Sequence, residues 1–285
     1  MKEKENLDKI REKTSEYLER YSIKCLVIGI SGGIDSALNC AILRSICVNL
    51  GIKLIGVSLP TDSNKIDEVN RANNIGRLFC DIFLEKNING ICESVNERFS
   101  NNIDRLLTFN DKIRYGNIKA RMRMIALYNE AYKHNGIVVD NDNKTEHLLG
   151  FWTLNGDVGD ITPMADLYKT EVYDLAEYLV EYELKTKEEK DALTACIECV
   201  ATDGLGITSS DLDQLGVPSY RTVDLILKNF VEEPSGDSFG TLIHELKYNS
   251  ISYKDENEVR EWVNVIVKRN QNSNFKRNHP YKIKL

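Results

Sequence analysis

The residues best suited to chemistry form one short run, Gly29-Ile30-Ser31-Gly32-Gly33-Ile34-Asp35-Ser36. Glycines lack a Cβ and tolerate positive φ, so backbone amides in such a turn can approach an oxyanion closely. The run follows an apolar stretch at 25–28 and precedes a helix-like stretch at 37–43, whose N-terminus adds further amides. Asp35 would repel a bare phosphate, so its presence indicates a bridging Mg²⁺. The run therefore predicts a phosphate-binding loop that works with a metal ion.

This loop is not a Walker A motif, because it lacks the lysine which that motif requires. It resembles the SGGxDS pyrophosphate loop of the N-type ATP pyrophosphatases. Those enzymes cleave ATP between the α and β phosphates to adenylate a carboxylate or a carbonyl oxygen. The resemblance implies ATP as co-substrate and Mg²⁺ as cofactor. The alternative is a glycine-rich turn between a strand and a helix that binds no ligand.

Apolar, strand-like runs alternate with helical patterns through the first half of the chain. The strand-like runs lie at 24–30, 53–59, 80–84 and 136–140, and the helical patterns lie around 36–48, 65–78, 91–107 and 117–134. Such alternation predicts an α/β fold with a mainly parallel sheet covered by helices on both faces. Ligands of such sheets bind at the carboxyl ends of strands, where the glycine loop lies. The resemblance implies a Rossmann-like sheet of the adenine nucleotide alpha hydrolase type.

The segments outside this alternation are expected to form further helices, surface turns and a long loop. Amphipathic spacing predicts helices at 3–21 and 169–181. The highly charged segment 183–191 is typical of a solvated surface, and 231–240 of a surface turn. Residues 199–217 are rich in Gly, Ser, Thr and Asp, and we expect a long functional loop there that is mobile without nucleotide.

Composition narrows the function classes. The 285 residues are 42% hydrophobic and 28% charged, which is ordinary for a soluble globular protein. The net charge of −7 argues against broad nucleic-acid binding. No apolar run reaches the length of a membrane span, and the charged segment 1–5 has no apolar run behind it. Seven scattered cysteines suit reduced thiols. We therefore expect a cytoplasmic protein that binds neither membrane nor nucleic acid.

Three further segments carry a more specific resemblance. The first is Gly116-Asn117-Ile118-Lys119-Ala120-Arg121-Met122-Arg123-Met124. The second is Asn143-Lys144-Thr145-Glu146, continued by 150–160 and 167–170, and the third is 202–206 with 213–216. Together with the loop they resemble NAD synthetase, over about residues 20–230, and a basic tail at 275–277 also fits. The resemblance implies one NAD synthetase domain over 1–285, with the pyrophosphate loop at 29–36 and a helical C-terminal extension from about 220.

Members of that family amidate deamido-NAD (nicotinate adenine dinucleotide) at the expense of ATP. The nicotinate carboxylate attacks the α-phosphate, pyrophosphate leaves, and ammonia then displaces AMP from the acyl-adenylate to give NAD. Some members carry an N-terminal glutaminase domain, whereas this chain begins about twenty residues before its first strand-like run. We therefore expect the ammonia-dependent form, or a subunit fed by a separate amidase. The family also implies a homodimer with deamido-NAD bound across the interface.

Residue by residue, the resemblance assigns an ATP and metal site. Asp35 and Glu146 match Mg²⁺ ligands, and Lys169 matches a lysine that contacts ATP phosphates and can stabilise the transition state. Thr202 matches a phosphate-contacting threonine. Asn141 stands where relatives have a threonine that contacts ATP.

The same resemblance assigns the other two substrates. Asp157 fits the ammonia site, where a carboxylate can deprotonate ammonium. The positions that match the deamido-NAD site are Arg121, Leu154, Asp160, Phe275 and Lys276. Leu154 departs from the family, because some relatives have a substrate-binding lysine there. Arg123, two residues after Arg121, would face elsewhere on a helix, which favours a structural role or a subunit contact.

Two rival functions remain at this point. Cys196-Ile197-Glu198-Cys199 gives some support to a tRNA-thiolating enzyme of the same superfamily, although no second pair lies at zinc-like spacing. The other rival is a degenerate, non-catalytic nucleotide-binding protein. The presence of Asp35, Glu146, Lys169 and Thr202 disfavours it.

Overall fold

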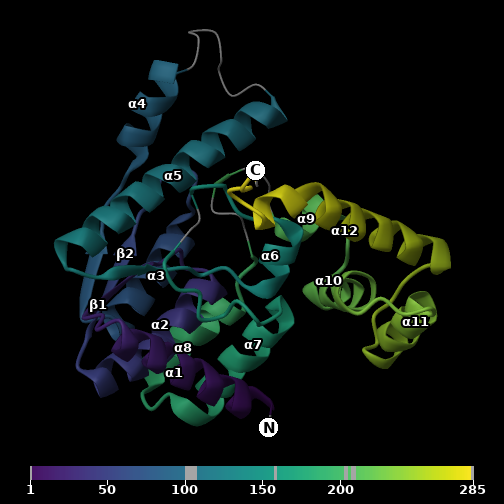
Figure 1. Cartoon of the computed structure of the whole chain (residues 1–285), viewed down its shortest axis with the longest axis horizontal. Coiled ribbons are helices and arrows are strands. Elements are labelled where there is room, and N and C mark those ends of the chain that lie inside the picture. The colour runs from purple at the N-terminus through teal and green to yellow at the C-terminus, as the bar shows by residue number, and fades with distance from the viewer. Residues whose placement is uncertain (1, 100–107, 157–158, 202–204, 207–209, 284–285) are drawn as a thin grey trace.

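The computed structural model describes residues 2–99, 108–156, 159–201, 205–206 and 210–283 (Figure 1). Its centre is a four-stranded parallel sheet with the order β3-β2-β1-β4. The strands are β1 (Cys25–Gly29), β2 (Lys53–Ser58), β3 (Ile82–Glu85) and β4 (Ile137–Val139). The prediction of an α/β fold with a parallel sheet is therefore confirmed.

Helices make up most of the rest of the described chain. In the first part these are α1 (Lys2–Arg20), α2 (Ile34–Leu50), α3 (Ile66–Phe79), α4 (Asn89–Phe99), α5 (Phe109–Lys133) and α6 (Lys144–Leu149). The second part has α7 (Lys169–Tyr178), α8 (Lys187–Ile197), α9 (Asp211–Leu215), α10 (Tyr220–Leu227), α11 (Ser238–Tyr248) and α12 (Glu256–Arg277), with π-helical turns η1 (Leu179–Glu183) and η2 (Lys228–Glu232) after α7 and α10. Within the described residues, no helix is long and apolar enough to cross a bilayer.

Strand β1 is buried on both faces, which explains its uninterrupted apolar sequence. Leu26 and Ile28 pack in the core formed with α1, α2, α3, α7 and α8. Cys25 and Val27 point to the other face, into the core formed with α4 and α5. This alternation is the period of two expected for a strand, and Figure 1 shows the two helical layers on either side of the sheet.

The strand order fixes where a ligand can bind. The chain runs from β1 outward to β2 and β3, and then returns to the other side of β1 as β4. The loops that follow β1 and β4 therefore diverge at the carboxyl edge of the sheet, and ligands of open α/β sheets bind at such a switch point. The loop after β1 is the glycine-rich run, and the loop after β4 leads into α6.

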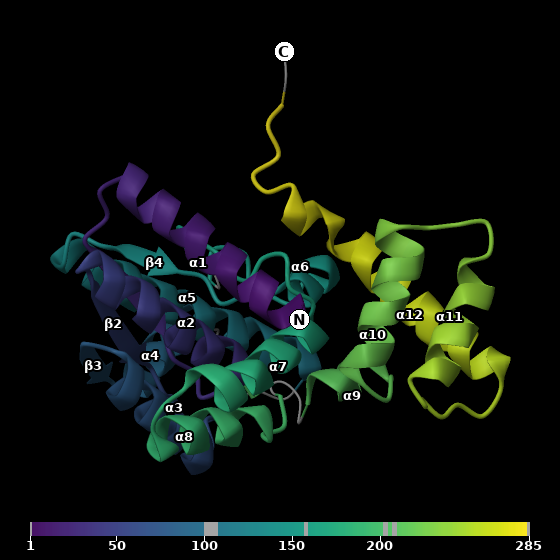
Figure 2. The same cartoon turned by 90° about the horizontal axis from the view of Figure 1, so that it is seen from below.

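Helices α10, α11 and α12 form a second layer beside the sheet domain. They bury a core of their own, including Val223, Leu246, Trp262 and Ile266. Leu149 at the end of α6 also joins this core. Figures 1 and 2 show that α6 and α7 lie between the sheet domain and the C-terminal helices. The carboxyl edge of the sheet is thus joined to the C-terminal layer through these two helices.

Two of the differences from the sequence prediction concern helices that begin at a capping residue. Helix α5 begins at Phe109, well before the expected 117, because Thr108 and Asp111 form a reciprocal capping box. The expected loop at 199–217 contains the short helix α9, which is capped by Ser210 and ended by Gly216 at a φ of +63°. At 199–217 the capping signal of Ser210 outweighed the composition, rich in Gly, Ser, Thr and Asp, that predicted a loop.

The two faces of α2 provide a test of this packing. Ile42 is fully buried, whereas Val48 on the same helix is 60% exposed. We expect Ile42→Ala to lower the free energy of unfolding by about 2–5 kcal/mol, because it leaves a cavity in the core. Val48→Ala should change it by no more than about 0.5 kcal/mol. Urea unfolding of both variants measures this, and equal losses would contradict the assigned orientation of α2.

Candidate active site

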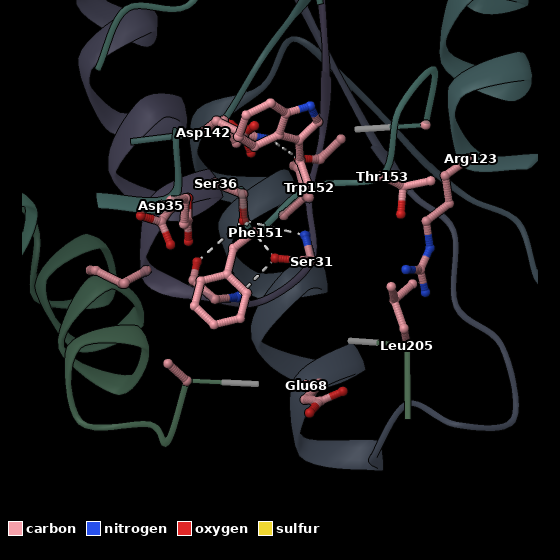
Figure 3. Close-up of a pocket in the computed structure, with 18 of the residues that line it drawn as sticks. Ser31, Asp35, Ser36, Glu68, Arg123, Asp142, Phe151, Trp152, Thr153 and Leu205 are labelled. Atoms are coloured by element: carbon pink, nitrogen blue, oxygen red, sulfur yellow. Dashed lines mark hydrogen bonds between the residues drawn. The ribbon is translucent and has the colours of Figure 1, made fainter. Parts of the chain in front are cut away.

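A cavity of about 810 Å³ opens at the carboxyl ends of β1 and β4. It is lined by the glycine-rich loop, by 139–142 after β4, and by side chains that include Glu146, Phe151 and Lys169. In Figure 3 the loop residues Ser31 and Ser36 lie in the middle of the view, with Arg123 and Leu205 to their right. The structure thus brings the predicted ATP-binding loop and the predicted metal ligands into one cavity.

The loop is shaped by its own two serines. The Ser36 hydroxyl accepts a hydrogen bond from the Ser31 amide at 3.2 Å and donates to the Gly33 carbonyl at 3.2 Å. The Ser31 hydroxyl accepts from the Gly33 amide, also at 3.2 Å. These contacts, drawn as dashed lines in Figure 3, curl the backbone into a cradle. A cradle of amides and hydroxyls at a helix N-terminus suits an oxyanion.

Gly32 is the position where only glycine fits. Its φ is +83°, and a Cβ there would lie 2.2 Å from the carbonyl oxygen of Glu68 on α3. The Arg71 guanidinium, also on α3, donates to the Gly32 carbonyl at 2.8 Å. Helix α3 therefore packs directly against the loop and holds its curvature, while its own Glu68 and Arg71 also line the cavity.

Three helices begin at this cavity. Asp35 lies in the first turn of α2, Glu146 lies in the first turn of α6, and Lys169 is the first residue of α7. The N-cap of α2 is Gly33, which has no side chain to cap the helix. The partial positive charge of each helix N-terminus favours bound anions. The N-terminus of α2, which no side chain caps, therefore favours a phosphate at this point.

Lys169 is the centre of the ionic contacts. Its ammonium forms ion pairs with Asp35 and, at 3.2 Å, with Glu146. Its side chain is only 2% exposed, so both carboxylates are needed to offset the loss of hydration. Asn143 completes the cluster: its amide group donates to Asp35 at 2.9 Å and accepts from the Glu146 backbone amide at 3.0 Å.

The cluster has unusual acid–base properties. Burial raises the pKa of Glu146 to about 7; the nearby ammonium of Lys169 opposes this rise and the negative charge of Asp35 adds to it. Burial lowers the pKa of Lys169, but the two carboxylates outweigh it and hold that pKa well above its usual value. Lys169 is therefore a permanent cation, whereas ionisation of Glu146 carries a free-energy cost.

The donor set fits Mg²⁺. A divalent cation shared by Asp35 and Glu146 would offset the cost of ionising Glu146, and carboxylate oxygens are ligands that Mg²⁺ prefers. Among the described residues, no group of three or more His, Cys, Asp or Glu side chains could hold a metal. Because Mg²⁺ beside a nucleotide usually keeps phosphate oxygens and water as ligands, the two carboxylates would share the ion with them.

Asn141 lines the cavity, but its side chain already has protein partners. Its amide group donates to the Gly29 carbonyl at 2.9 Å and accepts from Asn39 at 3.0 Å. Asn39 is completely buried on α2. Asn141 therefore connects the loop after β4 to the end of β1 and to α2. Its side chain has this structural role in addition to the ATP contact predicted from the sequence.

Aromatic side chains form another wall of the cavity. Phe151 and Trp152 both line it, and the Arg269 guanidinium of α12 stacks 3.7 Å from the centre of the Phe151 ring. Lys276, predicted to contact deamido-NAD, lines the cavity, and its ammonium donates to the carbonyls of Gly150 and Trp152. Helix α12 thus fixes the segment that carries this wall.

The other predicted deamido-NAD residues lie outside this cavity. Arg121 is exposed on α5 and donates to the Leu154 carbonyl at 3.3 Å. Asp160 accepts from the Val138 amide at 2.8 Å and from Tyr128, and Phe275 is 63% exposed. Arg123, for which the sequence favoured a structural role, lines the cavity while it donates to the Leu59 carbonyl at 3.2 Å. Asp157 and Thr202 lie outside the described residues.

Sequence reasoning missed three contributors to this site. Asn143, 1% exposed, joins Asp35 to Glu146, and Thr145 and Asp224 hold the start of α7. A signal for Asn143 was present, because Asn-x-x-Glu is a capping-box pattern that marks a helix start. For Asp224 the signal was weak, since a lone acid on an apolar helix does not reveal its distant partner.

Comparison with known proteins agrees with the family resemblance seen in the sequence motifs. Residues 6–280 match the family described as NAD synthase. The NH(3)-dependent NAD(+) synthetase of Thermoplasma acidophilum is 31% identical over 280 residues, which cover 96% of both chains. The enzyme of that name from Sulfurisphaera tokodaii is 38% identical over 228 residues, covering 79% of this chain and 74% of the relative.

Solved structures share the fold. The NH3-dependent NAD synthetase of Campylobacter jejuni superposes over the whole of both chains with a TM-score of 0.68 and 22% identity. The NMN synthetase of Francisella tularensis gives a TM-score of 0.68 at 24% identity over 99% of this chain and 97% of that one. These likenesses confirm the arrangement of sheet and helices.

The close contact at Gly32 generates a prediction. Gly32→Ala should weaken binding of MgATP at least about tenfold, because accommodating the Cβ must displace the loop or α3, and tenfold corresponds to only about 1.4 kcal/mol. Gly51→Ala is the matched control, since Gly51 also has a positive φ but has nothing within 4 Å of an added Cβ. Calorimetric titration measures both, and equal affinities would contradict the proposed role of the loop.

Proposed function

The chain belongs to the NAD synthase family, and from this premise we propose that it amidates deamido-NAD with ammonia, using ATP and releasing AMP and pyrophosphate. One observation carries the proposal within the structure. The buried ammonium of Lys169 lies between two carboxylates where three helices begin beside a glycine-rich loop. That arrangement is suited to hold a nucleoside triphosphate while its phosphate chain is broken.

The loop at 29–36 would bind the β and γ phosphates. Its amides and the N-terminus of α2 favour negative charge, and they favour it more as the pyrophosphate leaves and its charge grows. Fixed donors aimed at developing charge stabilise a transition state without reorganisation. The loop and Lys169 would therefore promote cleavage between the α and β phosphates rather than only bind ATP.

Asp35 and Glu146 would hold Mg²⁺ together with phosphate oxygens. When bound, the ion neutralises phosphate charge and so makes the α-phosphorus easier to attack. With both carboxylates ionised, the two acids and the Lys169 ammonium carry a net charge of −1. Asn143 keeps the Asp35 carboxylate in place through its 2.9 Å hydrogen bond, whether or not the ion is present.

The nicotinate carboxylate must reach the α-phosphorus from the side of the cavity away from the loop. Phe151 and Trp152 line the cavity and provide apolar surface against which a flat ring can pack. Exclusion of water from this space protects the acyl-adenylate from hydrolysis before ammonia arrives. Ammonia then attacks the activated carbonyl carbon, and the bond to AMP breaks.

Asp157 and Thr202 keep the roles proposed from the sequence motifs: deprotonation of ammonium and contact with phosphate. We also propose that two copies associate and that deamido-NAD lies across their interface. Support comes from Arg121, Leu154 and Asp160, which lie outside the cavity where a substrate shared between two subunits could reach them. A separate amidase is proposed as one source of the ammonia, and the cytoplasm as the site of the reaction.

Nothing in the comparisons supports the two rival functions. Cys196 is buried, and the Cys199 thiol donates to the Cys196 carbonyl at 3.1 Å. All seven cysteines are free, and burial raises the pKa of Cys196 to about 12, so this pair lacks the reactive thiolate that sulfur transfer needs.

Product analysis tests the proposal. With deamido-NAD, ATP, Mg²⁺ and ammonium, we expect NAD and AMP in equal amounts. Asp35→Ala should slow NAD formation at least about 100-fold, because it removes a metal ligand and a partner of Lys169. Asp67→Ala is the matched control, since Asp67 also follows an isoleucine in the first turn of a helix but is exposed on α3.

Each other outcome has a clear meaning. AMP and pyrophosphate without NAD would indicate another acceptor, and no AMP at all would favour a non-catalytic nucleotide-binding protein. Nicotinate mononucleotide is the comparison substrate, because one structure of this fold is named an NMN synthetase. Faster amidation of the mononucleotide would overturn the choice of dinucleotide.

The nitrogen source is a separate prediction. The relatives from Thermoplasma acidophilum and Sulfurisphaera tokodaii are named NH(3)-dependent. We expect ammonium to support NAD formation by the purified chain and glutamine alone to give none. Replacing ammonium by glutamine in the same assay checks this, with an added glutaminase as the positive control. Equal rates with glutamine alone would contradict an ammonia-dependent enzyme.

A further inference from the structure

The Asp224 carboxylate is an unusual feature of the C-terminal helices. Asp224 is only 2% exposed and lies on α10 beside Val223, Ile226 and Leu227, all of which are fully buried. Burial of its charge raises its pKa, although hydrogen bonds from Thr145 and Thr170 oppose the rise. Burying a carboxylate in an apolar helix face costs free energy unless the carboxylate is hydrogen-bonded, so its hydrogen bonds indicate the role of Asp224.

The contacts of Asp224 lead to the active site. It accepts a hydrogen bond from the Thr145 hydroxyl at 2.5 Å and from the Thr170 backbone amide at 2.9 Å. The Thr145 hydroxyl in turn accepts from the Lys169 backbone amide at 2.8 Å. Thr145 precedes Glu146, and Thr170 follows Lys169. One carboxylate on α10 thus holds the backbone next to both site residues.

These bonds satisfy the first amides of α7. The first amides of a helix have no partner within the helix, and the N-cap of α7, Tyr168, offers no side-chain acceptor. Thr145 and Asp224 supply acceptors from two other helices. The negative charge of Asp224 also lies at the positive end of α7, where it is stabilised by the helix dipole.

The direction of each bond makes the network specific. The Thr145 oxygen is occupied by the Lys169 amide, so its single proton points to Asp224, which as a carboxylate can only accept. Further contacts connect α6 with the start of α7 and with the turn η2 after α10. Lys144 of α6 forms an ion pair with Glu232 at 2.7 Å, and its ammonium packs over the Tyr168 ring. The position of Lys169 is thus coupled to α10.

We infer that Asp224 is a positioning residue, which acts through Thr145 and the first amides of α7 to hold Lys169 and Glu146 in register with the ATP phosphates. The inference rests on the proposed function and deepens it. Lys169 reaches its two carboxylates only if α7 begins at the observed place. A shift of about 1 Å in a catalytic group can lower a rate by about 100-fold.

Variants of Thr145 test the network without touching substrate. Thr145→Val keeps the branched shape but removes the hydroxyl, and Thr145→Ser restores it. We expect Thr145→Val to raise the Kd for MgATP and to lower kcat by roughly 10- to 100-fold, with a smaller change in the KM for deamido-NAD. Thr145→Ser should keep most of both. The intrinsic fluorescence of Trp152, which lines the cavity, reports binding of a non-hydrolysable ATP analogue.

Two further variants separate positioning from folding. Val223→Ala, one residue from Asp224, opens a cavity in the same helix face and should lower the melting temperature without changing ATP affinity. Asp224→Asn keeps the shape and removes the charge. If Asp224 and Thr145 act as one unit, the double variant Thr145→Val, Asp224→Asn should lose no more than the worse single variant.

The outcomes distinguish this inference from the proposed function. Equal loss of ATP affinity in Thr145→Val and Val223→Ala, or unchanged affinity in Thr145→Val, would overturn the positioning role. If the wild-type protein binds the ATP analogue, and only Thr145→Val and Asp224→Asn weaken it, the positioning role stands even if no NAD is formed. In that case the proposed function alone would fail.

Discussion

The ammonium of Lys169, buried between the carboxylates of Asp35 and Glu146, is the contact on which the rest of the site depends. The cation between the two acids offsets their mutual repulsion, Asn143 helps to hold them in place, and the two acids together offset the cost of burying the cation. Removing one partner of such a pair typically costs about 3–5 kcal/mol. The three residues come from three helices, so this mutual dependence also fixes how α2, α6 and α7 meet. A phosphate-binding point then follows from the N-terminus of α2, which no side chain caps, beside this cluster.

The two structural layers contribute differently. The parallel sheet provides the switch point between β1 and β4, and Asn141 ties the two loops that diverge there. The C-terminal helices provide acceptors and stacking partners from outside: Asp224 of α10 caps the start of α7, and Arg269 of α12 supports Phe151. The sheet therefore places the ATP end of the site, while the helical layer holds the residues that close around it. The short phosphate-binding loop therefore depends for its surroundings on both the sheet and the C-terminal helices.

Local sequence signals predicted the parts of the site that local physics determines. The glycine-rich run with Asp35 and the alternation of strands with helices could be recognised from the residues alone, whereas Glu146 and Lys169 were assigned only by the family resemblance. The structure places the loop, Asp35, Glu146 and Lys169 in one cavity. What could not be predicted depends on contacts between distant segments. Asn143 bridges residues separated by more than a hundred positions, and Asp224 reaches α7 across the interface of two layers. Arg121 and Arg123 were distinguished by helical spacing, but which of them faces the cavity depended on how α5 packs.

The most direct test of the account is the fate of the carboxylate oxygen. Deamido-NAD labelled with ¹⁸O in both carboxylate oxygens should transfer one labelled oxygen to AMP and keep the other in the amide of NAD. This result is required if the carboxylate attacks the α-phosphorus and ammonia then breaks the carbon–oxygen bond. Label in inorganic phosphate, or unlabelled AMP, would contradict adenylation at this site and with it the role assigned to the loop and to Lys169.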